Sequence, residues 1–340
     1  MMFIHHCWGF PEDVIMEHAP VLEAFAFWAN VPASFCVVIF CFITGYIYYF
    51  SPRKTYRASL SRIIKLLVPY CVVFVILISC SIYLLEYHYS LANIIDDVLT
   101  NRTVSNAWYV HFFIVLMLTL PLFAKFRPRS TVVKILVSCI LVPVLIKTLS
   151  RFIGIYYFRS LLENYACSAP TAFLGYIMAE NRFMEKADIF FSKNIPNRAR
   201  RLTLFTLLTI VIPIENYIKT IVIEDRPLLT YVFIPTLDMF ISLILVPVYL
   251  FCLVYICKAV TPLLFGKPFI YIGKESTFMW FLHSAFFNYE RVIFQPILFF
   301  PHFPSLITIW GLILCYFPAR GLRALLDLVS SKISLIRESK

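Results

Sequence analysis

The fold of this chain is decided by the stretch from Val31 to Tyr70, which reads VPASFCVVIFCFITGYIYYF–SPRKTYRASLSRIIKLLVPY. The first twenty of these residues carry no charge, and twenty helical residues at about 1.5 Å each are about 30 Å long, the thickness of a bilayer core. Five basic residues follow between positions 51 and 65, and a second apolar run leaves from Ile63. Because basic residues beside an apolar span mark the cytoplasmic side, this stretch predicts two membrane helices joined by an inner loop.

The composition extends this interpretation to the whole chain. The 340 residues are 61% hydrophobic and 14% charged, with a mean hydropathy of +0.81. A soluble domain is nearer 45–50% apolar and about 25% charged. The net charge of +11 lies between apolar spans rather than in one patch, so we expect membrane lipid as a partner and no nucleic acid.

We therefore predict an all-α integral membrane protein of about ten transmembrane helices, forming a single domain over residues 1–340. The first helix is expected to be incomplete at its N-terminal end. The predicted spans are Met1–Phe10, Val31–Phe50, Ile63–Leu85, Ala107–Ala124, Thr131–Leu149, Tyr165–Ala179, Leu202–Ile214, Asp238–Cys257, Thr277–Glu290 and Phe303–Ala319.

The loops test this topology independently. Alternate segments hold 23 of the 30 Lys and Arg residues, while most acidic residues lie in the others. This alternation predicts that both termini are cytoplasmic and that the segment after His6 is outside. The three longest outer segments, roughly 11–30, 86–106 and 215–228, are expected to form re-entrant or interfacial pieces. The basic segments are 51–65, 124–134, 181–201, 258–274 and 320–340.

The ten cysteines do not predict a metal site. Most lie within apolar spans and none forms a C-x-x-C pair, so small buried apolar residues are a better interpretation than disulfides or zinc ligands.

Two motifs near the N-terminal end are candidates for chemistry. His5 and His6 lie in an apolar run, where an ionisable side chain is a functional candidate, although an interfacial pair is the alternative. A neutral His can accept the proton of a sugar hydroxyl. Thr44-Gly45 lies in the second span and allows close approach of either a ligand or another helix, the helix being favoured.

A basic group lies at the cytoplasmic approach to the third span. Arg57, Arg62 and Lys65 precede Pro69, and the last two cations are three residues apart, on one face of a helix. Such cations can bind the phosphates of a coenzyme A nucleotide. A topology signal without ligand binding is an equal alternative.

Further candidates lie near the ends or in the bodies of later spans. Trp108 fits an interfacial aromatic belt, and for His283 polar packing and a functional role weigh equally. Glu215 and Asp238 are lesser candidates, favoured as interfacial residues. The remaining candidates in this group are His111 and Ser276.

In combination these residues resemble acyltransferase family 3, membrane proteins that O-acylate bacterial surface glycans. The resemblance covers nearly the whole chain and rests on five motifs in order. They are a His pair ending the first helix (Phe3–His6), an F-x-x-S-G-like element (Phe42–Gly45), an R-x-x-R-like element (Arg62–Lys65) before Pro69-Tyr70, Trp108-Tyr109, and a G-x-x-S…Y-L-x-H-like signature (Gly273–His283).

The resemblance implies transfer of an acyl group, usually acetyl, from cytoplasmic acyl-coenzyme A to a hydroxyl of a polysaccharide or its lipid-linked precursor. It implies a catalytic first-helix histidine, donor handling by the basic motif and a bacterial inner membrane. In the family a basic residue precedes that histidine by eleven positions, which favours His6 over His5 and falls before Met1 here. Thr44 and Lys65 stand where the family pattern has Ser and Arg.

Two questions stay open at this level. The histidine can act as a general base or carry the acyl group itself. A transporter or flippase of lipid-linked saccharides, and a membrane scaffold, are the rival classes; few charges within the spans and no visible repeat speak against transport.

Overall fold

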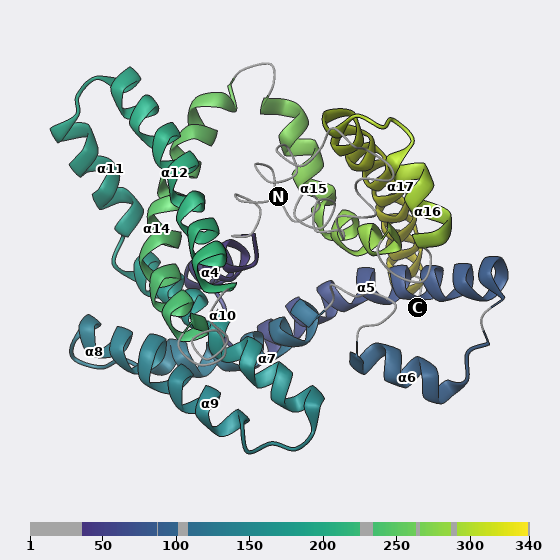
Figure 1. Cartoon of the computed structure of the whole chain (residues 1–340). Helices are drawn as coiled ribbons and strands as arrows, with labels where there is room; N and C mark the ends of the chain where they lie inside the picture. The colour runs from purple at the N-terminus through teal and green to yellow at the C-terminus, as the bar shows by residue number, and fades with distance from the viewer. Residues whose placement is uncertain are drawn as a thin grey trace. The chain divides into compact units, whose positions relative to one another are not determined.

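The computed structural model describes residues 36–86, 88–100, 108–224, 234–262, 266–286 and 291–338 (Figure 1). Every regular element in these ranges is helical, so the predicted all-α class is confirmed. The described chain divides into two compact units. The first comprises residues 36–63 and 110–262, and the second comprises residues 64–109 and 266–338, each with the gaps given above.

The helices follow the chain with few long connections (Figure 1). Residues 36–262 form α4 (Cys36–Phe50), α5 (Tyr56–Leu85), α6 (Leu91–Thr100), α7 (Trp108–Lys125), α8 (Thr131–Ile135), the π-helical turn η1 (Leu136–Leu141), α9 (Val142–Ser150), α10 (Tyr156–Glu180), α11 (Phe183–Asn194), α12 (Arg198–Glu224) and α14 (Ile234–Val260). The rest form α15 (Gly266–Leu282), the 3-10 turn η2 (His283–Phe286), α16 (Arg291–Phe299) and α17 (Pro304–Glu338).

Five segments in the described part of the chain are long and apolar enough to cross a membrane, and α4 is a shorter apolar helix. The five are Tyr56–Leu85, Trp108–Lys125, Thr131–Ser150, Ile241–Val260 and Leu306–Leu328. All five overlap predicted spans, which supports a multi-pass membrane protein.

Helix α10 forms the centre of the first unit. Its side chains are almost continuously buried from Tyr165 to Ala179, and α4, α9 and α14 all pack on it. The interior of α10 is rich in small residues, including Ala169, Ala172 and Gly175. Small residues let neighbouring helices approach closely in a membrane, where packing replaces the hydrophobic effect as the main attraction between helices.

These small residues allow the backbones of α4 and α10 to come into close contact. A Cβ atom built on Gly45 would lie 1.7 Å from the Ala172 carbonyl oxygen, and one on Gly175 would lie 2.2 Å from the Phe42 carbonyl oxygen. Neither distance leaves room for any side chain. Of the two partners expected for Thr44-Gly45, a helix is the one that contacts Gly45.

In the second unit, α15 packs against α17 and α16 contacts both η2 and α17. Residues 273–276 belong to α15, whereas the sequence placed them in a loop before a span at Thr277. The helix begins before the predicted span because charged residues end an apolar stretch without ending a helix. A helix continues through the headgroup region as long as its backbone hydrogen bonds are made.

Two segments outside the predicted spans also contain helices. In the predicted outer segment 86–106, α6 forms a ten-residue helix, and α11 forms a twelve-residue helix in the predicted inner segment 181–201. Helix α11 contains polar residues such as Lys186 and Asp188. Its segment is therefore not an apolar span, and no helix was predicted there.

Candidate functional site: a cationic end and an adjacent cavity

Arg62 is held in a defined position near the start of α5. Its Nη2 atom donates a hydrogen bond to Ser51 Oγ, and its guanidinium carbon lies 4.8 Å from the centre of the Tyr48 ring. The Nη1 atom is buried and has no hydrogen-bond partner among the described residues. A fixed guanidinium with an unpaired donor is suited to a phosphate oxygen, because its N–H groups form a planar fork.

The ring of Tyr48 connects this arginine to α10. Its hydroxyl lies 3.4 Å from that of Ser59, and its ring lies 6.5 Å from that of Tyr176. The Tyr49 ring meets Tyr176 edge to face at 5.3 Å and carries Lys54 Nζ at 4.8 Å from its centre. Cations over aromatic faces are held without losing their charge.

Lys134, within α8, brings a further cation to Tyr176. Lys134 is buried and forms an ion pair of 2.8 Å with Glu180. Its ammonium lies 5.2 Å from the centre of Tyr176 and 5.1 Å from that of Phe123. Lys134 of the predicted inner segment 124–134 therefore contacts Tyr176 directly, and the segment 51–65 reaches the same ring through Tyr48 and Tyr49. We call the group Tyr48, Tyr49, Lys54, Arg62, Phe123, Lys134, Tyr176 and Glu180 the cationic end of the first unit.

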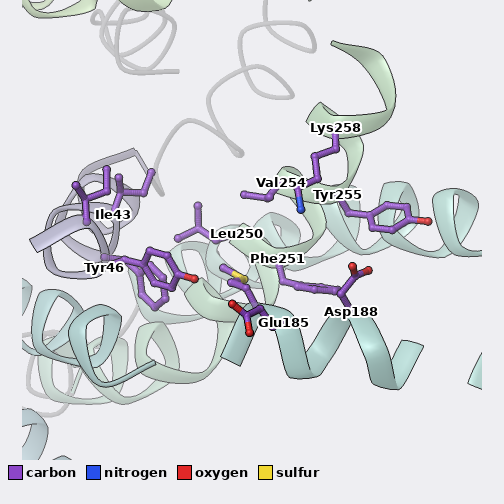
Figure 2. A pocket seen from close by; sticks show the side chains of 12 residues that line it. Ile43, Tyr46, Glu185, Asp188, Leu250, Phe251, Val254, Tyr255 and Lys258 are labelled. Atoms are coloured by element: carbon purple, nitrogen blue, oxygen red, sulfur yellow. The ribbon is translucent and has the colours of Figure 1, made fainter. Parts of the chain in front are cut away.

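A cavity of about 490 Å³ lies beside the cationic end, between α4, α11 and α14 (Figure 2). Helix α4 contributes Ile43 and Tyr46, and α14 contributes the stretch from Leu250 to Lys258. Most of the wall is apolar. The polar residues of its lining are Tyr46, Glu185, Asp188, Tyr255 and Lys258 (Figure 2). A volume of a few hundred Å³ with few polar groups is typical of a small-molecule site.

Aromatic packing holds the far wall of this cavity. The ring of Phe191 on α11 stacks on Phe251 at 5.5 Å, and Phe205 on α12 meets Phe251 at 5.3 Å. Arg201 closes the α11–α12 connection by donating to the carbonyl of Ile195 at 2.9 Å and to the Tyr255 hydroxyl at 3.0 Å. The cavity is thus bounded by a packed hairpin rather than by a loop.

The predicted donor residues are partly brought together. Thr44 and Gly45 lie on α4 between residues that line the cavity, Gly45 being covered by α10. Arg62 is half-buried in the cationic end, whereas Arg57 and Lys65 are exposed on α5.

The other predicted residues lie elsewhere. His111 on α7 meets the Tyr157 ring edge to face at 5.6 Å in the first unit. In the second unit, Trp108 begins α7, Ser276 is exposed on α15, and His283 is buried in η2. His5 and His6 lie outside the described residues. Glu215 and Asp238 lie within α12 and α14, and their side chains are outside the described part.

Sequence reasoning missed several residues of this site. Tyr48 and Tyr49 had no assigned role beyond the end of an apolar span, and Lys134 counted only within the basic segment 124–134. All three are contacts of the cationic end. Tyr176 and Glu180 gave no signal, because only the crossing of α10 beside α4 and α8 brings them to these cations.

Fold and site together define a multi-pass helical membrane protein with a phosphate-compatible cationic end next to a small-molecule cavity. The family model of acyltransferase family 3, described as an acyltransferase domain, matches residues 1–320. The chain belongs to this family, and it is an acyltransferase. No curated protein and no solved structure matches the chain significantly.

Proposed function

We propose that this protein transfers an acetyl group from cytoplasmic acyl-coenzyme A to a hydroxyl of an envelope, O-antigen or capsular polysaccharide, or of its lipid-linked precursor. It would act in a bacterial inner membrane, with about ten spans and both termini cytoplasmic. Support comes from the family match over residues 1–320 and the charge alternation. The observation that carries the donor assignment is that the Nη1 atom of Arg62 has no hydrogen-bond partner among the described residues.

In this proposal the cationic end binds one part of the acyl-coenzyme A donor and the cavity binds another part. Arg62, with the exposed Arg57 and Lys65, attracts the phosphates of the nucleotide. The pantetheine arm lies in the cavity, where its amide N–H groups can donate to the carboxylates of Glu185 and Asp188 and its methylenes contact Ile43 and Leu250. Both regions adjoin α4, since Tyr48 contacts Arg62 and Tyr46 lines the cavity.

The chemical step assigns His6 as the catalytic residue. As a general base it accepts the acceptor hydroxyl's proton while the oxygen attacks the thioester carbonyl. The C–S bond then breaks, and coenzyme A leaves as a thiolate that takes up a proton. Alternatively, the His6 ring nitrogen attacks first, and the acyl group moves from it to the hydroxyl in a second step.

The test is mass spectrometry of surface polysaccharide from cells with the gene, without it, and with His6→Ala. His5→Ala is the matched control, because it removes the neighbouring imidazole. We expect an acetyl group that requires the gene and His6 but persists in His5→Ala. Acetylation at near-wild-type level in His6→Ala would refute the catalytic assignment. If no acyl group tracks the gene, transport of a lipid-linked saccharide becomes the better explanation.

A further inference from the structure

A second cavity of about 700 Å³ lies in the second unit, between α15 and α17. Along α17 it is lined at positions 309, 313, 316 and 320, a helical repeat that forms one continuous face. The wall is apolar over most of its length, with Ile309, Ile313 and Phe317 exposed. We call this cavity the α15–α17 groove.

The polar part of the groove carries positive charge only. Its two ionisable cations are Lys267 on α15 and Arg320 on α17, and no carboxylate lines it. Two tyrosines accompany them, and Arg320 Nη1 donates to the Tyr316 hydroxyl at 3.3 Å. Within the described residues neither Lys267 nor Arg320 has a carboxylate at ion-pair distance.

A neighbouring arginine shows what a neutralised cation looks like here. Arg323, one turn further along α17, lies 3.3 Å from Glu275 and also donates to the Lys274 carbonyl. Arg323 is therefore engaged within the protein, whereas the two groove cations leave their charge available to a ligand.

The position of the groove along a candidate membrane span indicates which ligand fits its apolar wall and its two cations. The groove follows the candidate span Leu306–Leu328, and its cations belong to segments that the charge alternation places on the cytoplasmic side. The cytoplasmic leaflet presents anionic headgroups, and each nearby Lys or Arg strengthens binding to them by about 1 kcal/mol. Apolar walls below a cationic rim match acyl chains below a phosphate.

We propose that the α15–α17 groove binds one anionic phospholipid. Its phosphate lies between Lys267 and Arg320, and an acyl chain lies along Ile309, Ile313 and Phe317. The proposal does not depend on the acyl-transfer reaction. An apolar peptide or a second copy of the chain would fill the apolar wall but would leave both cations without a counter-charge.

The test uses the full-length protein purified in detergent and titrated with phosphatidylglycerol or with phosphatidylcholine of the same acyl chains, with bound lipid counted by native mass spectrometry. We expect one tightly held phosphatidylglycerol and weaker phosphatidylcholine. In Lys267→Ala/Arg320→Ala the phosphatidylglycerol affinity should fall about 30-fold, the loss of two contacts of this kind. The exchange Lys267→Arg/Arg320→Lys should keep most of it.

The matched control is Lys186→Ala/Lys193→Ala, which removes two exposed charges from α11, also in a predicted inner segment. This variant should bind phosphatidylglycerol like the wild type. An equal loss in both double variants would overturn the groove as the site, since only net charge would matter. Displacement of the lipid by millimolar inorganic phosphate would overturn the lipid assignment and leave a simple anion site.

Discussion

The two helix pairs α4–α10 and α15–α17 each carry a glycine on both helices, but the space around these glycines differs. An added Cβ on Gly45 or Gly175 would collide with the backbone of the partner helix. An added Cβ on Gly273 or Gly321 would meet no atom within 4 Å. The first pair excludes everything between its helices, and the second leaves a cavity of about 700 Å³. A glycine in a membrane helix therefore predicts close packing only when the facing helix supplies a matching small surface.

The cations near the two helix pairs also differ in burial: the tightly packed pair has a buried cation, and the open pair has exposed ones. Lys134 is buried between two aromatic rings and a carboxylate at the cationic end. Lys267 and Arg320 are exposed at the rim of the groove. A tightly packed helix pair needs internal partners for its charges, because burial makes an unpaired charge expensive. An open pair can use an external anion.

The largest effect is expected from closing the space at Gly45. Gly45→Ala places a methyl group against a backbone atom that cannot rotate away, so we expect a loss of about 3 kcal/mol in the free energy of unfolding or failure to accumulate. Thermal unfolding of the purified protein measures this. Gly321→Ala, also within a helix but with open space, should be neutral or stabilising by up to about 1 kcal/mol. Equal behaviour of the two variants would mean that Gly45 is not packed tightly against α10.

The second prediction breaks the charge pairing at the cationic end. Glu180→Gln leaves the Lys134 ammonium buried with its aromatic contacts alone, and we expect a loss of about 2 kcal/mol, moderated by the partial exposure of Glu180. Glu163→Gln is the control, because the Arg159–Glu163 pair is exposed on both sides and should contribute below about 1 kcal/mol. Chemical denaturation of both variants in the same micelles compares them. A Glu180→Gln loss no larger than that of the control would mean that Lys134 is solvated.

The third prediction concerns ligand binding by the cationic end and rests on the proposed function. Arg62→Gln removes the guanidinium whose Nη1 atom has no hydrogen-bond partner among the described residues. We expect coenzyme A to bind this variant about tenfold more weakly. Isothermal titration calorimetry with coenzyme A provides the measurement. Arg198→Gln, an exposed cation at the start of α12, should leave the affinity unchanged. If both variants weaken binding equally, the effect is long-range charge rather than a contact.

The smallest effect is expected within the packed core of the first unit. Tyr165 donates a hydrogen bond of 2.8 Å to Thr119 across α7 and α10. Tyr165→Phe should cost about 0.6 kcal/mol, the average found for such bonds between membrane helices. Tyr157→Phe, whose ring contacts His111, should cost less. A double variant with Thr119→Val that is no less stable than either single variant would show that the two hydroxyls act as a pair.

The sequence predicted the class and much of the local structure. Apolar spans beside basic loops predicted a helical membrane protein, and the ordered motifs predicted the family that the match over residues 1–320 confirms. Arg62 was singled out from its position alone. The start of α15 before the predicted span, and the helix α11, were not predicted, because hydropathy reports where a chain is apolar and not where its backbone remains helical.

What the sequence determined by itself is therefore what depends on neighbours along the chain: helical spans, their flanking charges and the family motifs. Only the tertiary structure decided which of the paired glycines are covered by a facing helix and which have open space beside them. It also decided that Tyr176 and Glu180 on α10 both contact Lys134 of α8. These outcomes depend on contacts between helices far apart in sequence, and the same side chain costs or contributes free energy according to the surface that faces it.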